Sequence, residues 1–143
     1  MRVLCTGPES SGTRLLARIV ATGTGIEAIH RSIPHGIDWD PFAPHAVGEI
    51  DRAILIVRSW TATAKSQSER GLVPNEAVGV EHLQIAIPIF FRDLGSHPWW
   101  MVTYQNLIDY PTVVLAELNA FLGAELSLPE DLYDANQKWI GVR

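Results

Sequence analysis

A glycine-rich stretch near the amino terminus restricts the fold more than any other segment. Residues 2–6 form a short apolar run typical of a buried strand, and residues 12–20 carry apolar side chains at helical spacing. Between them, positions 7–13 read Gly-Pro-Glu-Ser-Ser-Gly-Thr. Such a turn at the start of a helix presents backbone N–H groups and the helix dipole to an anion. An ordinary capped turn is the alternative, but the unbroken order of strand, glycine, hydroxyls, glycine and helix favours a phosphate or sulfate site.

Strand-like and helix-like segments alternate along the rest of the chain. Short β-branched and aromatic runs predict strands at 2–6, 26–30, 52–57 and 99–104. Apolar side chains at helical spacing predict helices at 12–20, 60–70, 75–94 and 111–122. This alternation is typical of a three-layer α/β domain with a mostly parallel sheet flanked by helices. Because ligands gather where such strands end, we expect Gly7, His30 and Arg58 along one rim.

Length and composition limit the classes of protein that this chain can represent. At 143 residues, of which 47% are apolar and 19% charged, we expect one folded domain spanning residues 1–143. The net charge of −5 argues against nucleic acid as a partner, because such binding needs a basic face. The longest apolar runs fall short of the ~20 residues of a membrane span. With Cys5 as the single cysteine, neither a disulfide framework nor a cysteine zinc site is expected, which favours a cytoplasmic protein with no membrane partner.

The residues after the second glycine decide which phosphate chemistry the loop suits. In P-loop nucleoside triphosphatases a lysine and then a serine or threonine follow that glycine, whereas Thr13 and Arg14 follow Gly12 here. A triphosphatase also places an aspartate after a later strand to hold magnesium, but the strand at 52–57 is followed by Arg58. A guanidinium attracts anions and repels a metal. Both differences point away from ATP hydrolysis.

Two motifs resemble those of the sulfotransferases that use 3′-phosphoadenosine 5′-phosphosulfate (PAPS). The stretch at 7–13 is similar to the family's 5′-phosphosulfate loop, and Arg58 followed eight positions later by Ser66 resembles its 3′-phosphate motif. Weaker similarities extend the resemblance over most of the chain, at 102–107, 109–111, 121–123 and 136–139. The resemblance implies a P-loop-like fold, PAPS as cofactor with 3′-phosphoadenosine 5′-phosphate (PAP) as product, and no metal.

The resemblance also implies roles for individual residues. The phosphosulfate would be held by Gly7, Ser10, Ser11, Gly12, Thr13 and Arg14. The 3′-phosphate would be held by Arg58 and Ser66. Ser10 stands where the family has a basic residue that stabilises charge on the leaving group. Arg14, in the first helical turn, is therefore the candidate for that catalytic role.

Sulfo transfer also needs a base that deprotonates the acceptor, here a hydroxyl or amine of a small molecule. His30, at the expected end of a strand, and His35, between Pro34 and Gly36, are the candidates. Glu9 lies inside the loop, where its carboxylate would repel a sulfo group, so we expect it to contact an acceptor or a backbone amide. The apolar helical segment at 85–91 is typical of a core helix or a subunit interface, which leaves a homodimer open.

Two other classes of function remain open at this point. A small nucleotide or metabolite kinase with an altered loop would bind ATP and require magnesium. A non-catalytic nucleotide-binding module would keep the anion site without turnover, as Ser10 in the basic position and the short chain allow.

Overall fold

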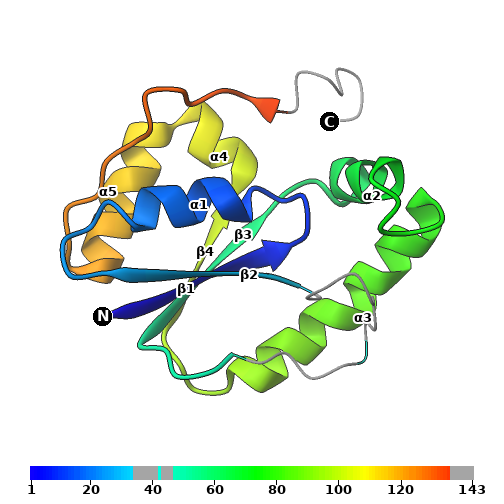
Figure 1. Ribbon diagram of the computed structural model, residues 1–143, viewed down its shortest axis with the longest axis horizontal. Helices are drawn as coiled ribbons and strands as arrows, with labels where there is room; N and C mark the ends of the chain where they lie inside the picture. The colour runs from blue at the N-terminus through cyan, green and yellow to red at the C-terminus, as the bar shows by residue number, and fades with distance from the viewer. Residues whose placement is uncertain (34–41, 43–46, 136–143) are drawn as a thin grey trace.

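A four-stranded parallel sheet organises the chain (Figure 1). The computed structural model describes residues 1–33, 42 and 47–135. Within them the strands are β1 (Arg2–Pro8), β2 (Glu27–Ile33), β3 (Arg52–Val57) and β4 (Trp99–Thr103). Their order is β2-β1-β3-β4, and Leu4 at the middle of β1 pairs with Ile29 on one side and Ala53 on the other. The prediction of an α/β domain with a parallel sheet is confirmed.

Helices cover both faces of this sheet. In the described ranges they are α1 (Thr13–Val20), α2 (Trp60–Glu69), α3 (Glu76–Leu94), α4 (Tyr104–Asp109) and α5 (Pro111–Leu122). On one face α1, α4 and α5 bury Cys5, Ile54 and Ile56. On the other, α3 packs on Leu4 and Leu55, and α2 packs on α3. Because helices lie on both sides, the central strands are apolar at successive positions rather than at alternate ones.

The chain reverses its course across the sheet after β2. It passes from β1 through α1 to β2 on one side, and then crosses to β3 on the other side of β1. The segments that leave the carboxyl ends of β1 and β3 therefore diverge, and open α/β sheets bind ligands in the crevice between such segments. Here the crevice lies between the loop after Pro8 and the segment that begins at Arg58.

Several element boundaries differ from those that the sequence predicts. Strand β1 continues through Gly7 and Pro8, which the sequence places in the loop. The sequence ends the second strand at His30, but β2 continues to Ile33 because its last residues pair with Thr6, Gly7 and Pro8 of β1. The sequence also places Tyr104 at the end of a strand. Instead Tyr104 begins α4, since Thr103 Oγ1 accepts a hydrogen bond from the amide of Asn106 at 3.1 Å and caps the helix.

None of the helices in the described part of the chain combines the length and the apolar character that crossing a bilayer would require.

The burial of Cys5 makes the stability of the fold depend on pH in the alkaline range. The residue is fully buried in β1, and this burial raises the pKa of its thiol from 9.0 to about 12. Between these values the unfolded chain releases a proton that the folded chain retains, so stability falls as pH rises. We expect the free energy of unfolding to fall by about 1.4 kcal/mol per pH unit above pH 9. Urea unfolding from pH 8 to 11 measures this slope, and a Cys5→Ala variant with the same slope would contradict it.

Candidate anion-binding site

The loop between β1 and α1 is a tight turn fixed to the neighbouring strand. The amide of Ser11 donates to the carbonyl of Pro8 at 3.0 Å, and Ser10, at φ 68°, has a left-handed backbone that only a minority of non-glycine residues adopt. The hydroxyl of Ser11, which is fully buried, donates to the carbonyl of Ile56 in β3 at 3.1 Å. The loop is therefore held against the carboxyl end of β3.

Gly7, near the end of β1, and Gly12, at the end of the loop, both allow close packing. A Cβ on Gly7 would clash with the carbonyl oxygen of Ile56, and a Cβ on Gly12 would lie 2.7 Å from Cδ2 of Tyr104. Gly12 also has φ +101°, in the region that disfavours side chains. The two positions bring the loop backbone against β3 on one side and the ring of Tyr104 on the other.

Helix α1 starts directly after this turn and leaves its first N–H groups without a side-chain cap. Ser59 and Asn75 cap α2 and α3 with a side-chain oxygen, but the N-cap of α1 is Gly12, which has none to offer. The first turn carries Arg14 and no acidic side chain. Uncapped N–H groups and the positive end of the helix dipole suit an anion at this position.

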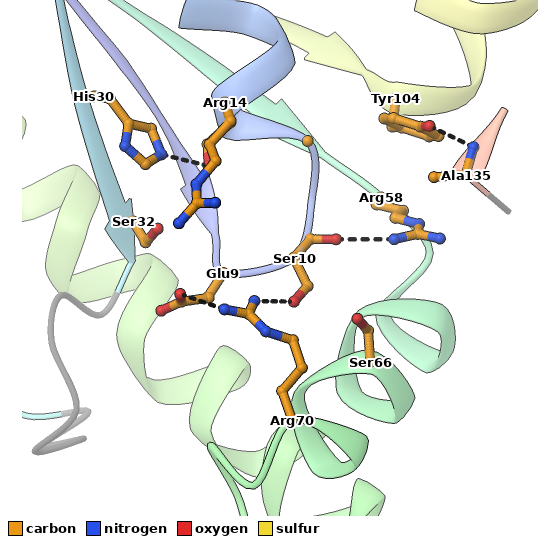
Figure 2. A pocket seen from close by; sticks show the side chains of 12 residues that line it. Glu9, Ser10, Arg14, His30, Ser32, Arg58, Ser66, Arg70, Tyr104 and Ala135 are labelled. Carbon is orange, nitrogen blue, oxygen red and sulfur yellow. Dashed lines mark hydrogen bonds and ion pairs between the residues drawn. The ribbon is translucent and has the colours of Figure 1, made fainter. Parts of the chain in front are cut away.

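A pocket of about 360 Å³ opens over the loop and the start of α1 (Figure 2). Its walls come from the loop, α1, β2, the end of β3, α2, α4 and the chain near 135: Glu9, Ser10, Gly12, Thr13, Arg14, His30, Ser32, Arg58, Ser66, Arg70, Tyr104 and Ala135. Among its described lining residues there are three arginines and one carboxylate, and the charge of Asp134 also acts on Arg58, whereas the whole chain carries a net charge of −5. This local excess of positive charge favours an anionic ligand.

A second pocket of about 330 Å³ adjoins the first and has a different character. The two share Gly12, Arg14, Tyr104 and Ala135. The wall of the second also includes Leu15, Leu132, Tyr133 and the ion pair of Arg18 with Asp131. Together they offer a cationic compartment next to a more apolar one. A ligand with anionic groups and a flat apolar ring system matches this division.

Arg58 lies between the loop and α4. Its Nη1 donates to the carbonyl of Ser10 at 2.9 Å, and its guanidinium lies 5.2 Å from the centre of the Tyr104 ring. Burial lowers the pKa of Arg58 from its ordinary value, yet an arginine stays charged at neutral pH. Ser66 of α2, which is 7% exposed, faces Arg58 across the pocket in Figure 2. The pair that resembles a 3′-phosphate motif therefore lines one pocket with the loop.

His30 reaches the same pocket from β2. Its Nε2 lies 2.9 Å from the hydroxyl of Thr13, the first residue of α1. Although His30 does not end its strand, its side chain points toward the mouth of the loop, where Figure 2 shows Arg14 as well. A histidine here can exchange a proton with a group bound at the start of α1.

The structure brings most of the predicted site residues together. Those that line the pocket are Ser10, Gly12, Thr13, Arg14, His30, Arg58 and Ser66. Gly7 and Ser11 do not line it: Gly7 packs on β3, and the hydroxyl and amide of Ser11 are both used within the fold. His35 lies outside the described residues.

Arg70 is a pocket residue that the sequence analysis missed. It follows Glu69 at the end of α2; its Nη1 donates to the hydroxyl of Ser10 at 2.9 Å, and its Nη2 lies 3.5 Å from Oε1 of Glu9. Among the described residues, the Glu9 carboxylate forms this ion pair, and its expected contact with an acceptor stays a prediction. The signal that could have found Arg70 is its spacing from Ser66, because residues four apart share one face of a helix.

In the described ranges, histidine, cysteine, aspartate and glutamate side chains do not gather in a group of three that could hold a metal ion. No family model, curated protein or solved structure matches this chain. Conclusions about function therefore rest on the chemistry of the pocket itself.

Proposed function

We propose that this chain is a PAPS-dependent sulfotransferase with a P-loop-like fold, which transfers a sulfo group to a hydroxyl or amine of a small molecule. One observation carries the proposal. The uncapped start of α1 follows β1, and Arg58 follows β3, yet both line a single cationic pocket. Two separate oxyanions on one nucleotide are the ligand that such an arrangement suits best.

The proposed ligand can be divided among the walls of the two pockets. The phosphosulfate would lie on the N–H groups at the start of α1, beside Thr13 and Arg14. The 3′-phosphate would lie between Arg58 and Ser66, because a guanidinium and a hydroxyl both donate hydrogen bonds to phosphate. The adenosine would occupy the adjoining pocket beside Leu15 and Tyr133, whose ring can stack on a base.

In this proposal the PAPS molecule supplies the sulfo group, and the chain supplies proton transfer and charge. His30 accepts the proton of the acceptor hydroxyl or amine at Nδ1, as the acceptor oxygen or nitrogen bonds to sulfur and the bond from sulfur to the 5′-phosphate oxygen breaks. The hydroxyl of Thr13 orients the imidazole by accepting from Nε2–H at 2.9 Å, which leaves Nδ1 as the basic nitrogen. Arg14 and the start of α1 face the negative charge that remains on the departing phosphate.

We expect isothermal titration calorimetry to show PAP binding in the micromolar range without magnesium, and weaker binding of ATP with or without it. The reason is that the loop has no lysine for a γ-phosphate, whereas Arg58 and Ser66 suit a 3′-phosphate. Tight ATP binding with no preference for PAP would instead indicate a kinase. Binding of PAP without transfer of label from [³⁵S]PAPS to any of a broad set of alcohols, phenols and amines would indicate a binding module.

A further inference from the structure

Helix α2 contacts the loop at two points one helical turn apart. The side-chain Nε2 of Gln67 donates to the backbone carbonyl of Glu9 at 3.0 Å, and Nη1 of Arg70 donates to the hydroxyl of Ser10 at 2.9 Å. The Gln67 side chain is fully buried, whereas the side chain of Arg70 is 48% exposed. The inner contact therefore fixes the loop, while the outer one holds a cation at the edge of the pocket.

The carboxylate of Glu9 forms an ion pair with this guanidinium. It lies 3.5 Å from Nη2 of Arg70, and only 21% of its side chain is exposed (Figure 2). It is also the single acidic side chain among the described residues that line the pocket, which include Arg14, Arg58 and Arg70. An anion that enters the pocket thus meets a carboxylate that is already paired with one of the three guanidinium groups of the pocket.

We propose that Arg70 binds the outermost oxyanion of the ligand and that Glu9 competes with the ligand for it. A partly exposed ion pair at 3.5 Å gains little, because water and side-chain entropy offset most of the attraction. A sulfo or phosphoryl group offers the guanidinium two oxygens in the geometry that it prefers, and displaces the carboxylate toward solvent. The contact of Nη1 with the Ser10 hydroxyl keeps Arg70 over the loop during this exchange.

This inference rests on the proposed function for the identity of the ligand, a nucleotide with a terminal sulfo group. The exchange itself needs only an oxyanion. Arg70, at the end of α2, then supplies the positive charge that the loop does not carry at Ser10. Glu9 is a residue that lowers the affinity for anions.

A double-mutant cycle tests the competition in calorimetric titrations of the full chain, with two probes: inorganic sulfate, and adenosine 5′-phosphosulfate, which carries the terminal sulfo group. We expect Glu9→Gln to tighten binding of both probes by about three- to fivefold, since it removes a weak competing pair. We expect Arg70→Gln to weaken both by about tenfold, the loss of a hydrogen bond to a charged group. In the Arg70→Gln background, Glu9→Gln should tighten binding by less than about twofold. Without Arg70 the carboxylate has no guanidinium for which to compete, so the two substitutions are not additive.

Glu69→Gln is the matched control, because it removes an equal charge from the adjacent position of α2, outside the residues that line the pocket. We expect it to leave both affinities unchanged. Equal gains from Glu9→Gln with and without Arg70 would show general repulsion and overturn the competition. If the two substitutions are coupled for sulfate but the protein does not bind PAP, the exchange is supported and the proposed nucleotide ligand is refuted. If the protein binds PAP but the two substitutions show no coupling, the exchange alone is refuted.

Discussion

A Gly12→Ala variant is expected to be about 3 kcal/mol less stable than the wild type and to lose measurable affinity for PAP, from the combined costs of backbone strain and overpacking. The backbone at Gly12 has φ +101°, and the added Cβ would lie 2.7 Å from Cδ2 of the buried Tyr104 ring. The same ring supports the guanidinium of Arg58 at 5.2 Å. One methyl group therefore disturbs both halves of the pocket. Urea unfolding and calorimetry with PAP measure the two effects.

Gly25→Ala is the matched control for this variant. Gly25 has φ +76°, but a Cβ there would meet no atom within 4 Å, and the residue precedes β2 at the opposite end of the sheet. It should cost about 1 kcal/mol of backbone strain and leave the affinity for PAP unchanged. Equal destabilisation by the two variants would show that the ring of Tyr104 yields without cost. Wild-type affinity in Gly12→Ala would remove the loop from the binding site.

The elements that the sequence predicts best are those whose signals are local. The apolar runs of β1 and β3 can be recognised because these strands lie inside the sheet and are buried on both faces. The N-cap of α3, Asn75, is equally clear, since its side chain accepts a hydrogen bond from the amide of Val78. Helix α4 was missed because its six residues are too few to show a helical period.

The site divides in the same way between local and distant contacts. The loop at 7–13 and the guanidinium of Arg58 stand out because glycine, hydroxyl groups and charge directly follow apolar strands. Ser11 looks the same as Ser10 in the sequence, but its hydroxyl bonds to Ile56, 45 residues later, and only the fold brings that carbonyl near. Arg70 was missed because a charge on the outer face of a helix usually faces water. Its contact with Ser10 spans 60 residues.

Arg58→Ala is expected to weaken PAP by about 10- to 100-fold, because hydrogen bonds from a charged donor contribute about 1.5–3 kcal/mol. Adenosine 5′-phosphosulfate has no 3′-phosphate, so its affinity should fall by only about twofold to threefold as loss of one hydrogen bond loosens the loop. That smaller effect follows from the bond between Nη1 of Arg58 and the carbonyl of Ser10. Titration of both ligands against the wild type and the variant separates the two contributions.

Two further variants decide what the loss in Arg58→Ala means. Arg52 lies at the opposite end of β3 and packs on the ring of Phe121 at 5.3 Å, much as Arg58 packs on Tyr104. Arg52→Ala removes an equal charge and a similar ring contact, so it should leave both affinities unchanged. Ser66→Ala leaves the bond from Arg58 to Ser10 in place, and it should weaken PAP by about tenfold, as loss of one hydrogen bond to a charged group does, without affecting the 5′-phosphosulfate. Equal losses of both ligands in Arg58→Ala and in Ser66→Ala would mean that these residues only support the loop, because a 3′-phosphate contact can be lost only by the ligand that carries that group.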